Sequence, residues 1–407
     1  MIIRKAYKFR LKTNVNIEES LTIFAGHSRF VWNYFWRLNK HRLDNRQRIM
    51  RYHEMNYWLT LLKQSDEYGF LSEAPAHILQ QKLMDLDKAY RDAFDKKQPN
   101  KRMPRLKKKH LHNSFRYPQG LQFKIENNRL YAPKLGWIGF FKSRNIQGKA
   151  KNITISKEGK NWFCSIGSEL ELNVAKKVPT SANSMGIDVG ITKFAALSNG
   201  EYIEPISAFK KHEDKLAKVG RILSKKQKFS NNWRKALRRI QELHGKIKNV
   251  RLDFLHKATT KISENQALVV VEDLKINNMS KSTKGTITDP GRNVRAKSGL
   301  NKAILDQGWG MFRLQLEYKL AWKGGLLVKV PAHHTSQKCN QCGYTESRNR
   351  QTQESFCCAL CGHKDNADMN AARNILAAGL AVIACGEAAL VASVKQESLG
   401  IGDLVPA

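Results

Sequence analysis

The chain has 407 residues, of which 71 are Lys or Arg and 35 are Asp or Glu, so its formal net charge is +36. Such an excess opposes compaction unless a polyanion neutralises it, so it argues against an ordinary metabolic enzyme and indicates a nucleic-acid partner. The length allows about two to four domains. The N-terminus lacks the apolar core of a signal peptide and no apolar stretch is long enough to cross a bilayer, which predicts a cytoplasmic protein.

The first half of the chain predicts a small β domain that a helical module interrupts. Residues 2–11 largely alternate apolar and charged side chains, which indicates one strand with a basic face. Residues 13–100 change to helical spacing, with Pro75 near the first turn of one helix. After a basic arm at residues 101–109, strand and turn patterns continue to residue 180. Together with the first strand they predict an antiparallel barrel.

The second half predicts an α/β sheet, because short apolar strands alternate with helices. Residues 209–257 are helical and strongly basic, and residues 278–302 form a polar loop that we expect to be mobile. The predicted boundaries are 181–337 for the first part of the α/β domain, 338–362 for a cysteine-rich insertion, 363–380 for the end of the domain and 381–407 for a disordered tail.

Two carboxylates lie in apolar strand patterns, where an unpaired charge is costly. Asp188 lies inside the stretch Gly186–Gly190, and Glu272 ends a run of Leu and Val. Each needs a counter-charge, because an unpaired ion there costs on the order of several kcal/mol. Asp368, which can start a helix of small residues, is a third candidate. Carboxylates from two strands and a helix start predict a site that binds two Mg²⁺ or Mn²⁺ ions and hydrolyses phosphodiester bonds.

Each of these acids also has an ordinary structural interpretation. Asp188 can mark a turn, Glu272 can cap a strand, and Asp368 can be a helix N-cap. Asp273 is an alternative to Glu272 as the strand-end carboxylate, and Asp365 is an alternative to Asp368 as the carboxylate at the helix start. The order of strand-borne Asp, strand-end Glu and helix-start Asp favours the metal site over any of these interpretations taken singly.

Four cysteines form two C-x₂-C pairs, Cys339 with Cys342 and Cys358 with Cys361, separated by fifteen residues. This spacing predicts a Cys₄ zinc ribbon in which four thiolates surround one Zn²⁺ and leave no open position. The zinc would be structural, holding a loop that is too small to build its own core. The competing ligands are Cys357, His333, His334 and His363.

Seven stretches of the chain occur together and in order in a known family: Phe30-Val-Trp-Asn33, Gly186-Ile-Asp-Val-Gly190, Arg251-Leu-Asp-Phe-Leu-His-Lys257, Val271-Glu-Asp-Leu274, Gly308-Trp-Gly-Met-Phe312 with Tyr318-Lys319, Thr335-Ser-Gln-Lys-Cys339 and Asp368-Met-Asn-Ala-Ala372. On these stretches the chain resembles the TnpB family, the insertion-sequence proteins of the OrfB type that are related to type V CRISPR effectors. The resemblance covers nearly the full length. The sequence departs from the family pattern at Cys357, which is an extra thiol, and at Asn366, where relatives often have a charged residue.

The resemblance implies a multi-domain α+β protein with a wedge-like β-barrel, a helical recognition module and a RuvC-like nuclease domain of RNase H fold. In that domain Asp188, Glu272 and Asp368 match the acidic triad. It also implies an RNA-guided endonuclease that cleaves double-stranded DNA beside a short flanking motif. The guide RNA would come from the transposon end, with one protein bound per RNA.

Nucleic-acid contacts are expected on side chains outside the metal site. A guide–target hybrid is held through its backbone charge, whereas amide and aromatic side chains can read a flanking motif. The candidate motif readers, which are equally well explained as ordinary surface residues, are Tyr52, His77, Gln80 and Gln81. The candidate backbone contacts are Arg105, Lys107, Lys108, Lys225, Lys226, Arg238 and Arg239. The polar loop at residues 280–299 is a hypothetical lid over the cleft.

Two other functions fit the same residues. A transposase would join DNA ends at the acidic site without any RNA. A regulator would bind nucleic acid through the zinc ribbon and the basic surface without catalysis. Replacement of Asp188 separates the regulator from both enzymes, and a requirement for RNA separates the endonuclease from the transposase.

Overall fold

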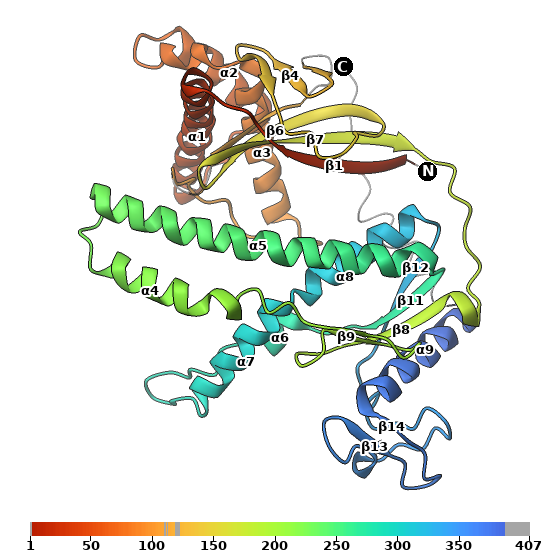
Figure 1. The fold of residues 1–407 in the computed structure, drawn as a ribbon. Coiled ribbons are helices and arrows are strands. Elements are labelled where there is room, and N and C mark those ends of the chain that lie inside the picture. Colours follow the sequence, from red (N-terminus) through yellow and green to blue (C-terminus); the bar gives the residue numbers. More distant parts are fainter. Residues whose placement is uncertain (1, 110, 112, 119–122, 387–407) are drawn as a thin grey trace. The chain divides into compact units, whose positions relative to one another are not determined.

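The computed structural model describes residues 2–109, 111, 113–118 and 123–386. The chain divides into two compact units, residues 1–173 and residues 174–407, and each is described by itself (Figure 1). Among the described helices, none has the length and apolarity needed to span a bilayer.

The first unit begins with a strand and a set of helices. These elements are β1 (Ile2–Arg10), α1 (Val15–Asp44), α2 (Tyr52–Gln64), the 3₁₀ helix Gly69–Glu73 and α3 (Ala76–Phe94). The predicted first strand is present as β1, and the side chain of Asn14 caps α1 by accepting the Ile17 N–H. Pro75 immediately precedes α3, where its missing N–H costs nothing.

Two antiparallel sheets complete the first unit. Their other strands are β2 (Ser114–Tyr117), β3 (Lys124–Glu126), β4 (Arg129–Ala132), β5 (Gly136–Gly139), β6 (Lys149–Glu158) and β7 (Asn161–Glu171). One sheet has the order β1-β7-β6-β2 and the other β3-β4-β5. An antiparallel bridge between Leu11 and Phe140 joins them. Because β1 pairs along its whole length with β7, the chain returns to its first strand after the helices.

The basic arm of residues 101–109 is held against α1. The indole N–H of Trp32 donates to the Arg105 carbonyl (3.0 Å), and that of Trp36 donates to the Pro104 carbonyl (2.7 Å). The amide of Asn33 pairs with both backbone groups of Lys107. The stretch Phe30–Asn33 therefore fixes the backbone of the arm.

The second unit contains a mixed five-stranded sheet with helices on both faces. Its elements are β8 (Ser184–Val189), β9 (Ala195–Leu197), β10 (Tyr202–Ile203), α4 (Glu213–Ser224), α5 (Asn231–Asn265), β11 (Leu268–Glu272), α6 (Ile276–Met279), α7 (Val294–Gln307), α8 (Trp309–Trp322), β12 (Leu326–Val330), β13 (Ser355–Cys357), β14 (Lys364–Asn366) and α9 (Ala367–Ala384), with 3₁₀ turns at Ser181–Asn183, Lys210–His212 and Ser347–Asn349. The sheet order is β10-β9-β8-β11-β12; β8 to β10 are antiparallel, whereas β11 runs parallel to both β8 and β12.

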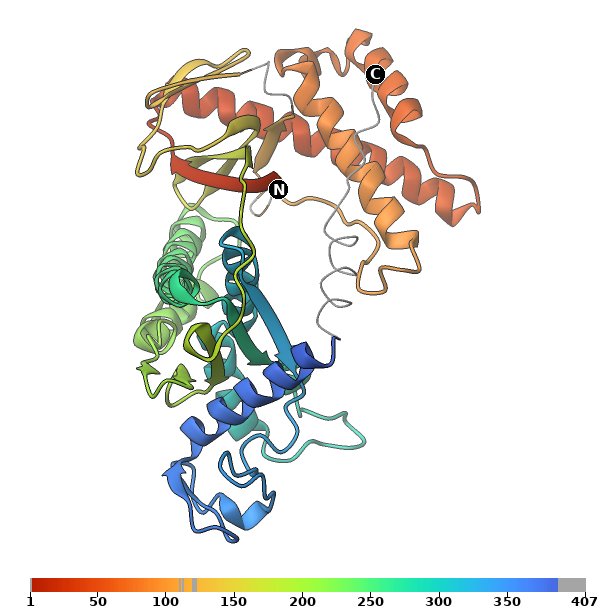
Figure 2. The same ribbon diagram turned by 90° about the vertical axis from the view of Figure 1, so that its right-hand side faces the viewer.

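The apolar run in β11 follows from burial on both faces. Val269 and Val271 pack into the cluster formed with α5 and α8, whereas Leu268 and Val270 pack against α9. Helix α9 lies along this second face, with the cysteine-rich insertion beyond its first turn (Figure 2). Its close approach requires Gly379, because a Cβ there would overlap the side chain of Val270.

Three element boundaries differ from the sequence prediction. The basic helical stretch predicted at residues 209–257 contains two helices, α4 and α5, which a loop at residues 225–230 connects. The two helices pack side by side (Figure 1). The predicted loop is shorter, because α7 begins at Val294; Gly308, in the left-handed region (φ +75°), separates α7 from α8. Helix α9 runs to Ala384, past the predicted start of the tail, and residues 387–407 of that tail lie outside the described residues.

Candidate active site and metal centre

Asp188 and Glu272 lie on neighbouring parallel strands. Val271 of β11 is in register with Ile187 of β8, so Glu272 and Asp188 are each one residue further along their strands. Adjacent strands are about 4.8 Å apart, and both residues are partly buried. The hydroxyl of Thr335 donates to Glu272 Oε1 at 2.6 Å and fixes one of its oxygens.

Asp368 reaches the same region from the start of α9. The side chain of Asn366 caps this helix by accepting the backbone N–H groups of Asp368 and Met369. In the first turn, a carboxylate is favoured by the positive end of the helix dipole. The helix comes close to β8 because Gly186 has no side chain; a Cβ there would overlap the Ala372 carbonyl.

Asp188 feels the negative charges of both Glu272 and Asp368. Burial, together with the negative charges of Glu272 and Asp368, raises the pKa of Asp188 to about 8. Burial also raises the pKa values of Glu272 and Asp368. The three carboxylates offer hard oxygen ligands, and a divalent cation bound to them would offset the negative charge around Asp188. The donor set therefore fits Mg²⁺ or Mn²⁺.

Arg350 adds a positive charge to this site that no sequence motif predicts. It lies in the insertion between the two cysteine pairs, and its Nη2 atom is 3.3 Å from Asp368 Oδ1. Its charge lowers the pKa values of both Asp368 and Asp188. In the sequence it is one of several basic residues in a polar loop, so no local pattern distinguishes it.

The two competing acids have other partners. Asp273 forms an ion pair with Arg313 of α8 at 2.9 Å, and its side chain is 54% exposed. Asp365 is paired with Arg373 of α9. Neither contributes to the shifted pKa of Asp188, whereas Asp368 does. The electrostatic surroundings of Asp188 therefore favour Glu272 over Asp273 and Asp368 over Asp365.

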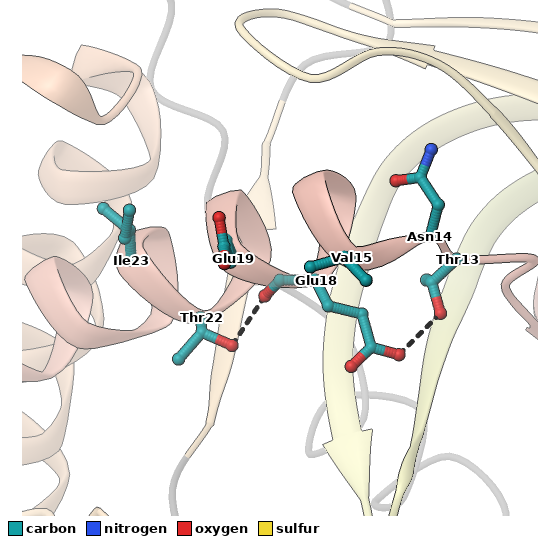
Figure 3. Close-up of a pocket in the computed structure, with 7 residues that line it drawn as sticks. All are labelled: Thr13, Asn14, Val15, Glu18, Glu19, Thr22 and Ile23. Carbon is teal, nitrogen blue, oxygen red and sulfur yellow. Dashed lines mark hydrogen bonds between the residues drawn. The ribbon is translucent and has the colours of Figure 1, made fainter.

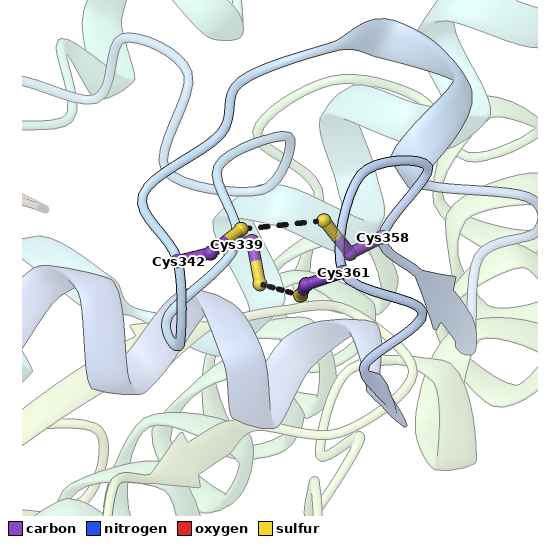
Figure 4. A group of neighbouring side chains, drawn as sticks. All are labelled: Cys339, Cys342, Cys358 and Cys361. Carbon is purple, nitrogen blue, oxygen red and sulfur yellow. Dashed lines mark hydrogen bonds between the residues drawn. The ribbon is translucent and has the colours of Figure 1, made fainter.

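The four cysteines of the two C-x₂-C pairs converge (Figure 4). Their sulfur atoms all lie within 4.8 Å of one another, with 3.8 Å between Cys339 and Cys361 and 3.5 Å between Cys342 and Cys358. A tetrahedral Zn²⁺ with bonds of about 2.3 Å requires sulfur atoms about 3.8 Å apart. The cluster therefore fits a zinc ion, and the competing ligands predicted from the sequence are not part of it.

Three buried or mostly buried asparagines anchor the insertion. Asn349 donates to the Gln337 carbonyl and accepts the Ala359 N–H, which links the two halves of the insertion. From α9, Asn370 and Asn374 both donate to the Lys338 carbonyl. The sequence feature that could have indicated this anchoring is the pair of asparagines four residues apart in a helix of small residues. Their effect is to fix the cysteine loop to the helix that carries Asp368.

The candidate nucleic-acid contacts lie mostly at the surface of their elements. His77 is exposed on α3, Gln80 and Gln81 are partly buried there, and Tyr52 opens α2. Lys107 is partly buried, with its ammonium 3.5 Å from the centre of the Trp32 ring. The remaining candidates are all exposed: Arg105, Lys108, Lys225, Lys226, Arg238 and Arg239.

An open hollow of about 660 Å³ adjoins the start of α1 (Figure 3). Glu18 and Glu19 contribute carboxylates to its lining, and Glu18 accepts a hydrogen bond from the Thr13 hydroxyl. Its lining residues include no basic side chain. The hollow is therefore unsuited to a phosphate group, and it lies in the first unit, whereas the carboxylates of Asp188, Glu272 and Asp368 belong to the second.

Three sequence families match parts of the chain. A family described as "Probable transposase" (OrfB_IS605) matches residues 167–283, the Cas12f1-like TNB domain matches residues 309–375, and a helix-turn-helix domain of the OrfB_IS605 type matches residues 1–48. In the structure, the last of these spans holds β1 and α1 and ends just after that helix.

Two curated proteins match almost the whole chain. "Putative RNA-guided DNA endonuclease InsQ" of Escherichia coli is 47% identical over 94% of this chain and 94% of its own length. A "Putative RNA-guided DNA endonuclease" of Streptomyces pristinaespiralis is 32% identical over 95% of this chain and 92% of its own length. Among solved structures, the mini-RNA-guided endonuclease CRISPR-Cas_phi3 is 11% identical over 92% of each chain, with a TM-score of 0.47.

Proposed function

Because this chain belongs to the TnpB family of insertion-sequence proteins, we propose that it is an RNA-guided endonuclease that cleaves double-stranded DNA. One observation carries the proposal: buried Asp188 lies within the electrostatic reach of Glu272 and Asp368, two carboxylates that are far from it in the sequence. Negative charges beside a buried carboxylate are costly for the folded protein, and divalent cations of the kind that nucleases use would offset that cost.

The three carboxylates would hold two Mg²⁺ or Mn²⁺ ions, which when bound activate a water and stabilise the leaving 3′ oxygen. The side chains around them have separate tasks. Thr335 holds Glu272 in place, and Asn366 starts the helix that positions Asp368. The Arg350 guanidinium, beside Asp368, can contact a phosphate oxygen of the strand to be cut.

The proposed nuclease domain has an RNase H-like fold of the RuvC type. Its support is the sheet in which three antiparallel strands, β8 to β10, are followed by the parallel strands β11 and β12. The insertion would be a zinc ribbon holding one Zn²⁺ on Cys339, Cys342, Cys358 and Cys361. We assign the joined sheets of the first unit to a wedge-like barrel and its helices to a recognition module.

The guide RNA and the DNA target would be held chiefly through their backbones. Exposed basic side chains on α5 and on the loop before it, including Arg238, Arg239 and Lys225, suit phosphate contacts. On α3, His77 and Gln80 would read the flanking motif in the major groove. The loop at residues 280–293 would act as a lid, and its deletion should reduce target-dependent cleavage.

The test is cleavage of a plasmid that carries the target, by protein purified with its own RNA. We expect cutting with Mg²⁺ and RNA, and none after RNA is removed. Glu272→Gln should abolish cutting, whereas Asp273→Asn, the adjacent carboxylate paired with Arg313, should leave it within about a few fold of the unmodified protein. RNA binding should be unchanged in both variants.

Three outcomes would contradict the proposal. Strand transfer by RNA-free protein would favour a transposase. Equal cutting by the unmodified protein and Glu272→Gln would remove the carboxylates from catalysis. Loss of cutting in Asp273→Asn but not in Glu272→Gln would mean that Asp273, and not Glu272, is the catalytic carboxylate of β11 and its end.

A further inference from the structure

The solvent-facing side of the β3-β4-β5 sheet carries two neighbouring aromatic rings. Leu130 and Ile138 are fully buried, whereas the residues next to them, Tyr131 and Trp137, are 37% and 43% exposed. Strand register places Lys124, Tyr131 and Trp137 in one row across the three strands. The two ring centroids are 5.5 Å apart. The row therefore presents two adjoining rings and a cation to solvent.

The same face continues from β5 onto the end of β1. Phe140 is buried, and the next residue, Phe141, is 47% exposed. The Arg10 guanidinium and the Lys12 ammonium lie 4.3 Å and 5.1 Å from the centre of the Phe141 ring. Gly139 leaves space for the Lys12 side chain, since a Cβ there would be 3.3 Å from Lys12 Cδ.

These residues form a surface that we call the aromatic–basic band. Its rings are Tyr131, Trp137 and Phe141, and its cations are Arg10, Lys12, Lys124 and Arg129. The adjacent cations of β1 are paired, Arg4 with Glu169 and Lys8 with Glu158. In the described part of the chain, by contrast, no carboxylate forms an ion pair with a cation of the band, although the exposed Glu126 lies across from Arg129.

The fold itself does not need these exposed rings. The inner faces of both sheets already supply the core, with Leu11, Leu130, Ile138 and Phe140 buried in one cluster. Exposed aromatic faces interleaved with cations match the two chemical needs of an unpaired nucleotide, whose base stacks and whose phosphate requires a positive charge. A paired base in a duplex has its faces already occupied.

We propose that the aromatic–basic band binds unpaired nucleotides of RNA, with bases stacked on Trp137, Tyr131 and Phe141 and phosphates held by the cations. This inference rests on the proposed function, in which the guide is the permanent partner of the protein. The displaced DNA strand is instead a substrate of the carboxylates in the second unit. The RNA is therefore the occupant that fits a fixed array of rings in the first unit.

The experiment measures binding of fluorescein-labelled 12-nucleotide oligo(U) RNA and oligo(dT) DNA to the full chain, freed of copurified RNA and without divalent metal. Trp137→Ala should weaken oligo(U) binding about tenfold, and Trp137→Phe should recover most of the loss. Trp58→Ala is the matched control, because Trp58 is 46% exposed on α2 and lies outside the band. Thermal unfolding should be unchanged in all three variants, since neither tryptophan is in the core.

Salt separates stacking from charge. The ratio between unmodified and Trp137→Ala affinities should stay the same from 0.1 to 0.4 M salt, whereas the loss caused by Arg129→Gln should shrink. Ultraviolet crosslinking of oligo(U) should modify a peptide within residues 129–141. Equal effects of Trp137→Ala and Trp58→Ala, or crosslinks only outside this peptide, would overturn the inference. An equal loss of oligo(dT) binding would overturn the assignment to RNA.

This binding assay involves no cleavage, so its result is independent of catalysis. Protein that cuts DNA under RNA guidance but binds oligo(U) equally with and without Trp137 would refute only the band. Protein that loses oligo(U) binding in Trp137→Ala but never cuts would refute the nuclease assignment and leave the band in place.

Discussion

The Arg350 Nη2 atom lies 3.3 Å from Asp368 Oδ1, although the arginine belongs to the cysteine-rich insertion and the aspartate to the start of α9. Arg350 also donates to the Gln353 carbonyl, which orients its guanidinium within the loop. The asparagines of α9 hold the same insertion by its backbone. The position of a positive charge at the carboxylates therefore depends on the cysteine loop being intact.

Arg350→Ala should reduce DNA cleavage about 100-fold while RNA binding is unchanged. The variant removes a cation aimed at the place where a scissile phosphate would carry charge, and such donors are worth about 10² to 10³ in rate. Single-turnover cleavage of a plasmid target measures the effect. Arg348→Ala is the control, because Arg348 belongs to the same loop but its side chain is 86% exposed and pairs with Glu346. Equal rates for the two variants would contradict the assignment.

Cys342→Ser should release the zinc and, through Arg350, lower cleavage. Elemental analysis should find about one zinc per chain in the unmodified protein and almost none in Cys342→Ser, because three thiolates bind far more weakly than four. Cys357→Ser should keep its zinc, since Cys357 lies outside the cluster although it is adjacent to Cys358. Zinc loss in Cys357→Ser instead would mean that the second pair is spaced differently.

Gly186→Ala should destabilise the second unit by about 3 kcal/mol or more. The added Cβ would overlap the Ala372 carbonyl and stand 2.7 Å from the Leu376 nitrogen, so α9 would have to move away from β8. Gly220→Ala in α4 meets open space and should stabilise the helix by about 0.5 to 1 kcal/mol. Urea unfolding monitors both. A stable Gly186→Ala protein that still cuts DNA would show that the contact between β8 and α9 is not tight.

Lys107→Met should stabilise the RNA-free protein near pH 7 and have less effect near pH 10. Burial and the nearby Lys82 lower the pKa of Lys107 to about 7, although Asp85 acts in the opposite direction. The contact of the ammonium with the Trp32 ring also favours the charged form. In the unfolded chain the pKa is about 10.4, so between pH 7 and 10 only the unfolded chain binds this proton. Stability at this site therefore falls as the pH falls through that window.

Methionine keeps the aliphatic contact with Trp32 and removes the proton. We expect a gain of about 1 kcal/mol at pH 7, since Lys107 is only partly buried. Thermal unfolding of both proteins from pH 7 to 10 gives the difference directly. A difference that is independent of pH would mean that Lys107 keeps its charge in the folded protein.

Local patterns in the sequence were sufficient for most element positions. The alternation of residues 2–11 predicted β1, and the apolar run before Glu272 predicted β11 as a buried strand. Patterns failed where a single residue decides the backbone path. Gly308 ends α7 and starts α8, and α7 extends into a polar stretch that has no clear apolar period. Polar composition favours a loop, but packing of Ile304 overrides it.

The sequence by itself determined the cysteine spacing, the apolar surroundings of Asp188 and Glu272, and the helix whose first turn carries Asp368, because each of these depends on a few neighbouring residues. Only the tertiary structure decided that Arg350 and Thr335 lie beside these acids while Asp273 and Asp365 pair elsewhere. The physical reason is range: charges and hydrogen bonds act over a few ångströms in space, and residues separated by 63 positions, such as Glu272 and Thr335, come that close only when the sheet and its insertion have folded.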